Sequence, residues 1–156
     1  MLIEWLIIDG YNLLHETEEL ARLMKTDLHL ARNKLVRLVE AAALDMAPQT
    51  TIVFDGRESG IDESLTVKHL EVYFSPSNLS ADTIIERLVC RFPNPGKILV
   101  VTSDHAERVT VSSAGAQTMS SFEFMAQCKT MARKPARNTN PPGREPRLGD
   151  LFPDLS

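Results

Sequence analysis

The feature that most constrains the fold is a set of short segments that are apolar along almost their whole length. Residues 2–8 and 50–54 are of this kind, and residues 97–102 repeat the pattern later in the chain. Each segment is as long as a buried β-strand, so both faces of each strand must be covered. The stretches between them carry helical periodicity. Strands that are apolar on both faces and alternate with helices predict an α/β fold with a mainly parallel central sheet.

The remaining elements are predicted from helix caps, proline breaks and periodicity. The DGYN motif of residues 9–12 follows the first strand and is interpreted as a turn, and residues 15–24 are interpreted as a weak helix or a loop. Helices are predicted for residues 28–46, 81–91, 104–113 and 121–131, and further strands for residues 66–74 and 116–119.

The chain has 156 residues, which suits one compact domain. Residues 1–132 are predicted to form this domain, and residues 133–156 a flexible, basic, proline-rich tail without a core pattern. No apolar stretch approaches the about 20 residues that span a bilayer, and the apolar N-terminus is interpreted as a strand, not a signal peptide. Cys90 and Cys128 are predicted to be buried free thiols, which suits a cytoplasmic protein.

Acidic residues follow the ends of the predicted strands. Asp9 and Asp55 come directly after the first and second strands, Asp104 follows the strand at 97–102, and Asp82 opens a helix. In a parallel sheet such positions meet at the carboxyl edge, where ligand sites lie. Like charges gathered there repel one another unless a cation lies among them, and an oxygen-only donor set suits Mg²⁺ or Mn²⁺. The pattern therefore predicts metal-assisted hydrolysis of a phosphodiester.

Each of these residues also has a purely structural interpretation. Asp9 could form only a turn, Asp82 could only complement a helix dipole, and Asp104 could cap its own helix. Asn12 is either a turn residue or a hydrogen-bond partner of a metal-bound water. Glu86 is either a further ligand, one turn after Asp82, or a solvated charge. Their shared position at one edge of the sheet favours the functional interpretation.

Three motifs in this order, DGYN at 9–12, ADTIIE at 81–86 and VTSD at 101–104, are more specific than any one of them alone. With further matching segments between residues 3 and 126, they resemble the YacP-like NYN-domain family, which is related to the PIN-domain nucleases. The resemblance implies a PIN-like three-layer α/β/α sandwich and metal-dependent endoribonuclease activity on RNA. Some relatives act on messenger RNA on the ribosome, so the resemblance suggests ribosome-associated messenger RNA as one candidate substrate.

Carried over position by position, the resemblance implies that Asp9, Asp82 and Asp104 bind the metal and that Asn12 acts beside them. Ser103 and Glu86 are implied as supporting residues. Asp55 is left out of the metal set, because Phe54-Asp55-Gly56 is also interpreted as a structural turn.

Basic residues must hold the RNA. Arg32 is predicted to do so, because it lies in a segment that resembles the family, whereas Lys34 and Arg37 on the same helix are interpreted as solvated charges. Arg57 and Lys68 flank the second and third predicted strands and are further candidates. The basic residues after residue 128 either engage phosphates or only keep the tail soluble.

A second hypothesis is an RNA- or ribosome-binding module with weak or no catalysis. The clustered carboxylates argue against it, because a pure binder does not need negative charge facing a phosphate. A phosphatase or nucleotide hydrolase shares the carboxylate chemistry but would need a nucleophile motif or a phosphate-binding glycine loop, and neither pattern is present.

Overall fold

The structure is a computed structural model that describes residues 2–56 and 69–132. Its centre is a five-stranded sheet of order β3-β2-β1-β4-β5 in which every neighbouring pair is parallel. The strands are β1 (Trp5–Asp9), β2 (Gln49–Phe54), β3 (Leu70–Phe74), β4 (Ile98–Val101) and β5 (Gln117–Met119). The helices are α1 (Gly10–Glu16), α2 (Glu18–Thr26), α3 (Leu28–Ala43), α4 (Ala81–Arg91), α5 (His105–Ser113) and α6 (Ser121–Ala132), with a short 3₁₀ turn, η2 (Pro95–Lys97). The predicted α/β fold is confirmed, and the sheet is wholly parallel.

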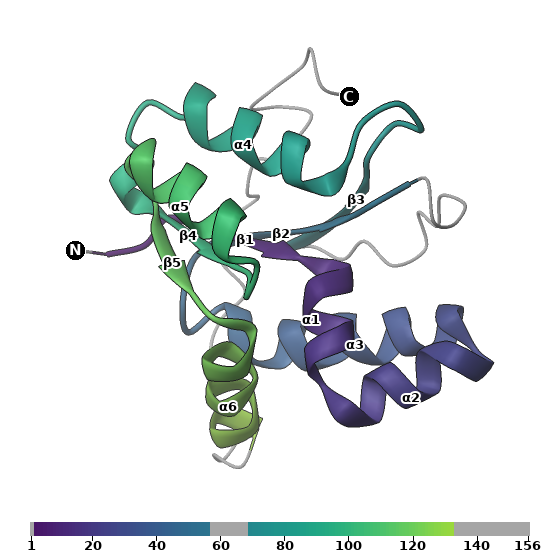
Figure 1. Cartoon of the computed structure of the whole chain (residues 1–156). Coiled ribbons are helices and arrows are strands. Elements are labelled where there is room, and N and C mark those ends of the chain that lie inside the picture. Colours follow the sequence, from purple (N-terminus) through teal and green to yellow (C-terminus); the bar gives the residue numbers. More distant parts are fainter. Residues whose placement is uncertain (1, 57–68, 133–156) are drawn as a thin grey trace.

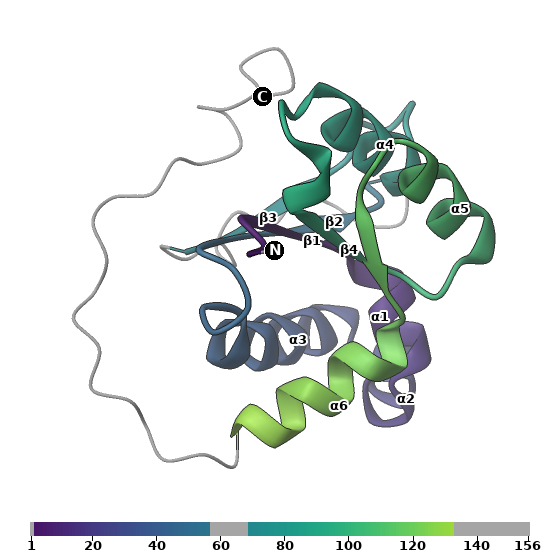
Figure 2. The ribbon, with the colours of Figure 1, turned by 90° about the vertical axis from the view of Figure 1, so that its left-hand side faces the viewer.

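Helices cover both faces of the sheet, as Figures 1 and 2 show. The central strand β1 illustrates why. Leu6 and Ile8 point to one face and share a core with α1, α2, α3 and α6, whereas Trp5 and Ile7 point to the other face and share a core with α4 and α5. All four side chains are 1% exposed or less. The alternation of buried side chains along a strand thus produces the predicted three-layer sandwich.

The carboxyl ends of the central strands lie at one edge of the sheet. Ile8 of β1 is aligned with Ile52 of β2 and with Val101 of β4. The chain leaves this edge into α1 after β1 and into α5 after β4, and α4 follows β3 across a short loop. The first turns of these three helices therefore surround one region of the molecule.

The DGYN motif is not a turn, so that prediction was wrong. Helix α1 begins at Gly10, directly after β1, and Asp9 is its N-cap, with a carboxylate that accepts a hydrogen bond from the Asn12 amide. Position 10 requires glycine because a Cβ there would overlap the Phe54 ring. The segment predicted as a weak helix or loop is helical, with a break at Thr17 between α1 and α2.

The other helices and strands lie where they were predicted, with ends that differ by a few residues. Cys128 is buried as predicted, but Cys90 is exposed, because it lies on the outer side of α4. Residues 66–68 of the third predicted strand and the predicted tail at 133–156 lie outside the described residues. In the described part of the chain, every helix is too short or too polar to cross a membrane.

Candidate metal centre

Three carboxylates converge at the carboxyl edge of the sheet. Asp9 ends β1, Asp82 lies in the first turn of α4, and Glu107 lies in the first turn of α5. One oxygen from each lies within 4.8 Å of those of the other two. Asp9 and Glu107 are buried, and Asp82 is half-buried. The structure thus brings Asp9 and Asp82 together from distant parts of the sequence and adds Glu107, which the sequence had not suggested.

Glu107 has one satisfied and one unsatisfied carboxylate oxygen. Its Oε2 accepts a hydrogen bond from the Thr102 hydroxyl at 3.0 Å. Its Oε1 is buried and has no hydrogen-bond partner in residues 2–56 and 69–132. A buried, unpaired carboxylate oxygen beside two other carboxylates is costly unless a proton or a cation compensates it. The donor set therefore fits a divalent metal ion.

We call Asp9, Asp82 and Glu107 the carboxylate triad. Their pKa values also indicate a site for a cation. Burial, and after it the charges of Asp9 and Asp82, together raise the pKa of Glu107 from an ordinary 4.5 to about 10. Burial likewise raises the pKa of Asp9 from 3.8 to about 6, although its interaction with Glu107 and the hydrogen bond from the Asn12 backbone amide oppose this shift. Without a metal, a protonated Glu107 can donate a hydrogen bond to Asp9. This proton then reduces the repulsion between the carboxylates, as a bound cation would.

We expect Mn²⁺ to raise the melting temperature more at about pH 8 than at about pH 5. Both pKa values are raised in the folded state, so over part of the pH range the folded protein binds more protons than the unfolded chain. For Asp9 this range runs from pH 3.8 to about pH 6, and for Glu107 from pH 4.5 to about pH 10. The metal-free protein therefore loses stability as the pH rises through that range. A metal must displace these protons, so its binding strengthens with pH.

Thermal denaturation in EDTA and in Mn²⁺, across this pH range, measures both effects. A metal-induced shift in melting temperature that does not change with pH would contradict the assignment of the triad as the binding site.

Asp104 lies next to the triad but outside it. It is exposed, it is the N-cap of α5, and its Oδ1 accepts a hydrogen bond from the Glu107 amide at 3.0 Å. The carboxylate thus fixes the backbone from which Glu107 reaches the triad, and its role as a metal ligand stays a prediction. Glu107 could have been found from the sequence, because an acidic residue three positions after an N-cap is a known helix-start pattern and belongs to the same turn.

Asn12 joins three parts of the chain behind the triad. Its Oδ1 accepts hydrogen bonds from the Ser103 amide and from the Ser121 hydroxyl, each at 2.8 Å. The Ser103 hydroxyl in turn accepts from the Ser121 amide at 3.0 Å. These bonds tie α1 to the loop after β4 and to the start of α6. Asn12 and Ser103 therefore support the site through its framework, and a contact between Asn12 and a metal-bound water stays a prediction.

Replacing Asn12 with alanine should lower the free energy of unfolding by about 1–3 kcal/mol, because the Ser103 amide and the Ser121 hydroxyl would lose their acceptor. Chemical denaturation measures the change. Asn94→Ala is the matched control, because Asn94 is exposed and its side chain makes no capping hydrogen bond. Equal stability of the two variants would show that the Asn12 network does not hold these elements together.

Two further predicted or considered acids lie outside the triad. Glu86 is half-buried on α4, one turn after Asp82. Asp55 is half-buried after β2, and the next residue, Gly56, donates its amide to the Ser75 hydroxyl at 3.0 Å. A Cβ at position 56 would overlap the Ser75 carbonyl oxygen. This close approach supports the interpretation of Phe54-Asp55-Gly56 as a structural turn.

Arg32 is a buried residue of α3, in the helical layer on the face of the sheet opposite to α4 and α5. It is 6% exposed, its Nη1 donates to the Tyr11 hydroxyl at 3.2 Å, and its guanidinium lies 5.4 Å from the centre of the Phe74 ring. These contacts give it a packing role below the carboxyl edge, and a contact with RNA stays a prediction. Lys34 and Arg37 are exposed on the same helix, while Arg57 and Lys68 lie outside the described residues.

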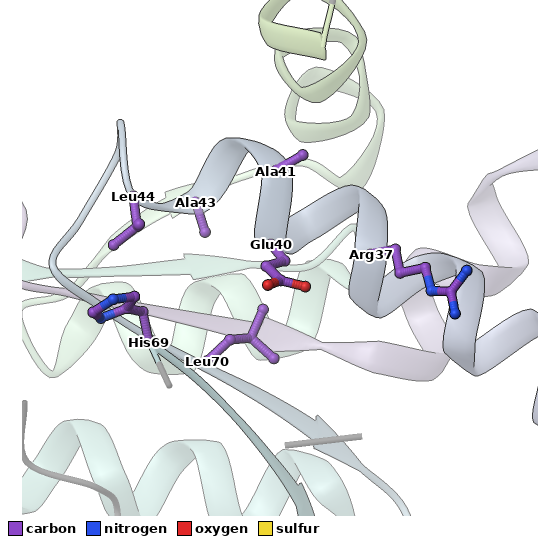
Figure 3. Close-up of a pocket in the computed structure, with 7 residues that line it drawn as sticks. All are labelled: Arg37, Glu40, Ala41, Ala43, Leu44, His69 and Leu70. Carbon is purple, nitrogen blue, oxygen red and sulfur yellow. The ribbon is translucent and has the colours of Figure 1, made fainter. Parts of the chain in front are cut away.

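A cavity of about 340 Å³ lies away from the triad, at the amino edge of the sheet. Figure 3 shows it between the end of α3, with Arg37 and Glu40, and the start of β3, with His69 and Leu70. Because β3 begins at this edge, the cavity and the carboxylates lie at opposite ends of the strands. We therefore place the chemistry at the triad, not in this cavity.

Comparisons with known proteins agree with this fold. The sequence model described as "YacP-like NYN domain" matches residues 6–148. The Bacillus subtilis (strain 168) protein YacP, which is described as uncharacterized, is 28% identical over 131 residues, covering 83% of this chain and 77% of YacP. A crystal structure of Rae1 (YacP) from Bacillus subtilis superposes with a TM-score of 0.74 at 28% identity, over 84% of this chain and 76% of the other. The W164L mutant of Rae1 gives a TM-score of 0.71 at 27% identity, over 84% and 78% of the two chains.

Proposed function

This chain belongs to the YacP-like NYN domain family of PIN-like nucleases, and we propose from that premise that it is a divalent-metal-dependent endoribonuclease. The observation that carries the proposal is the meeting of Asp9, Asp82 and Glu107 within 4.8 Å at the carboxyl edge of a parallel sheet. The family implies an RNA substrate. Messenger RNA on the ribosome is the substrate class that we would test first.

Mg²⁺ or Mn²⁺ suits the triad best, because all of its donors are carboxylate oxygens. When bound, such an ion activates water and neutralises charge on the phosphodiester in transition. The triad residues supply the negative charge that holds the ion, and the Thr102 hydroxyl orients Glu107 through its Oε2. Burial of Asp9 and Glu107 keeps bulk water from screening that charge.

Asp104 has two roles in this proposal. Its hydrogen bond to the Glu107 amide positions Glu107, and its exposed carboxylate is a candidate ligand at the rim of the site. Asn12 and Ser103 hold the loop that carries Asp104. We also propose a cytoplasmic location, which the two free thiols of Cys90 and Cys128 support.

The proposal is tested with end-labelled single-stranded RNA and the full chain, in Mg²⁺, Mn²⁺, Ca²⁺ or EDTA. Internal cleavage in Mg²⁺ or Mn²⁺, and none in EDTA, is the expected result. RNA binding is measured in the same samples. RNA binding without cleavage in any of these metals would overturn the proposal. It would favour an RNA-binding module, a function that the clustered carboxylates do not support. The assay is repeated with ribosome-bound messenger RNA before a negative result is accepted.

A further inference from the structure

Phe122 is the most exposed large apolar side chain in the described helices and strands. It is the second residue of α6 and is 77% exposed. Its backbone is nevertheless well anchored, because Ser121 before it and Phe124 two residues after it are both 0% exposed. A fixed backbone that presents an aromatic ring to solvent forgoes the free energy of burying that ring.

The start of α6, which carries Phe122, belongs to the same part of the molecule as the triad. Ser121, the residue before Phe122, donates its hydroxyl to Asn12, and the Asn12 amide donates to Asp9 at 3.3 Å. The Ser121 amide also donates to Ser103, in the loop that leads to α5. Figures 1 and 2 both show α6 beginning beside α1, at the carboxyl edge of the sheet. Two hydrogen bonds therefore connect the residue next to Phe122 with a triad carboxylate.

The charge around Phe122 indicates which part of a nucleic acid it would meet. The next residue, Glu123, is exposed, and the first turn of α6 carries no basic side chain. A phosphate would be repelled by Glu123, whereas the face of a nucleobase is uncharged and stacks on aromatic rings. The position thus fits a base better than a backbone.

We propose that Phe122 is a stacking platform for an unpaired nucleobase beside the phosphodiester that the triad addresses. The proposal rests on the proposed function and deepens it, because it names single-stranded RNA as the substrate class. A base in a duplex is already stacked and paired, so only a splayed base can lie on the ring. Since every base has a π-face, the platform tolerates different bases and adds little sequence preference.

The test measures binding of a labelled single-stranded RNA by fluorescence anisotropy in Ca²⁺, with a duplex of the same length beside it. Phe122→Ala should weaken single-strand binding about tenfold, as expected from the loss of one base stack, and leave duplex binding unchanged. Phe122→Trp should retain the affinity, and Phe122→Leu should not, because leucine supplies bulk without a π-face. Leu44→Ala is the matched control, since Leu44 is 47% exposed at the opposite edge of the sheet.

A second readout separates stacking from a general effect on the fold. An RNA that lacks one base next to the cleavage position should bind the wild type more weakly, and Phe122→Ala should bind both RNAs equally. Unchanged binding by Phe122→Ala, wild-type binding by Phe122→Leu, or no measurable RNA binding by the wild type would each overturn the stacking role. Absence of cleavage with Phe122-dependent binding would instead overturn the proposed function and leave the stacking role standing.

Discussion

Replacement of Asp9 by asparagine should reduce RNA cleavage more than about 100-fold while the protein stays folded. Loss of a residue that merely supports a metal ligand costs about 10–100-fold, and loss of a ligand should exceed that. Asn at position 9 can still accept the hydrogen bond from the Asn12 amide, so the cap of α1 survives. The substitution also removes a buried charge that desolvation disfavours, and the asparagine oxygen can still accept from a protonated Glu107, so the metal-free melting temperature should not fall.

Cleavage rates under Mn²⁺, together with circular dichroism, measure the two sides of this prediction. Asp45→Asn is the matched control, because Asp45 is an exposed aspartate near the opposite edge of the sheet. If the Asp9→Asn protein cleaves RNA as fast as the wild type, Asp9 at the end of β1 is not part of the catalytic site.

Glu107→Gln should reduce RNA cleavage by as much as Asp9→Asn does. Comparison with Asp104→Asn then shows whether Asp104 binds the metal as well as capping α5. Glutamine keeps an oxygen that can accept the Thr102 hydroxyl but loses the charge, so Mn²⁺ affinity and cleavage should both fall more than about 100-fold. The pH dependence of the metal-free melting temperature should also weaken, because the group with the pKa of about 10 is gone.

Asparagine at position 104 can replace aspartate as an N-cap, so the Glu107 amide keeps its acceptor. If Asp104 acts only as a cap, Asp104→Asn should retain most of the activity that Glu107→Gln loses. An equal loss in both variants would make Asp104 a ligand as well. Full activity of Glu107→Gln would contradict the triad itself.

The fold could be predicted because few alternatives satisfy strands that are apolar on both faces. The central strand β1 is buried at every position, and only a parallel sheet between two helical layers covers it. The same topology placed Asp9 and Asp82 at one edge before any contact was known. Both belong to connections that leave the carboxyl ends of strands.

Glu107 was missed because Asp104, three residues before it, follows the strand more closely and was the acid predicted for that connection. Its direction depends on the first turn of α5, which the Asp104 cap and the Thr102 hydroxyl fix in three dimensions. The links of Asn12 to Ser103 and Ser121 could not be predicted, because they span 91 and 109 positions and have no local signature. Burial of Arg32 also depends on tertiary packing, since its partners lie on α1 and β3.

A crystal structure of the full chain grown with Mn²⁺ would test the central claim most directly, through its anomalous difference density. We predict a peak that contacts oxygens of Asp9, Asp82 and Glu107, the three carboxylates that lie within 4.8 Å of one another. A further oxygen from Asp104 is compatible with that result. A Mn²⁺ peak elsewhere, or an empty triad at a Mn²⁺ concentration that supports cleavage, would contradict it.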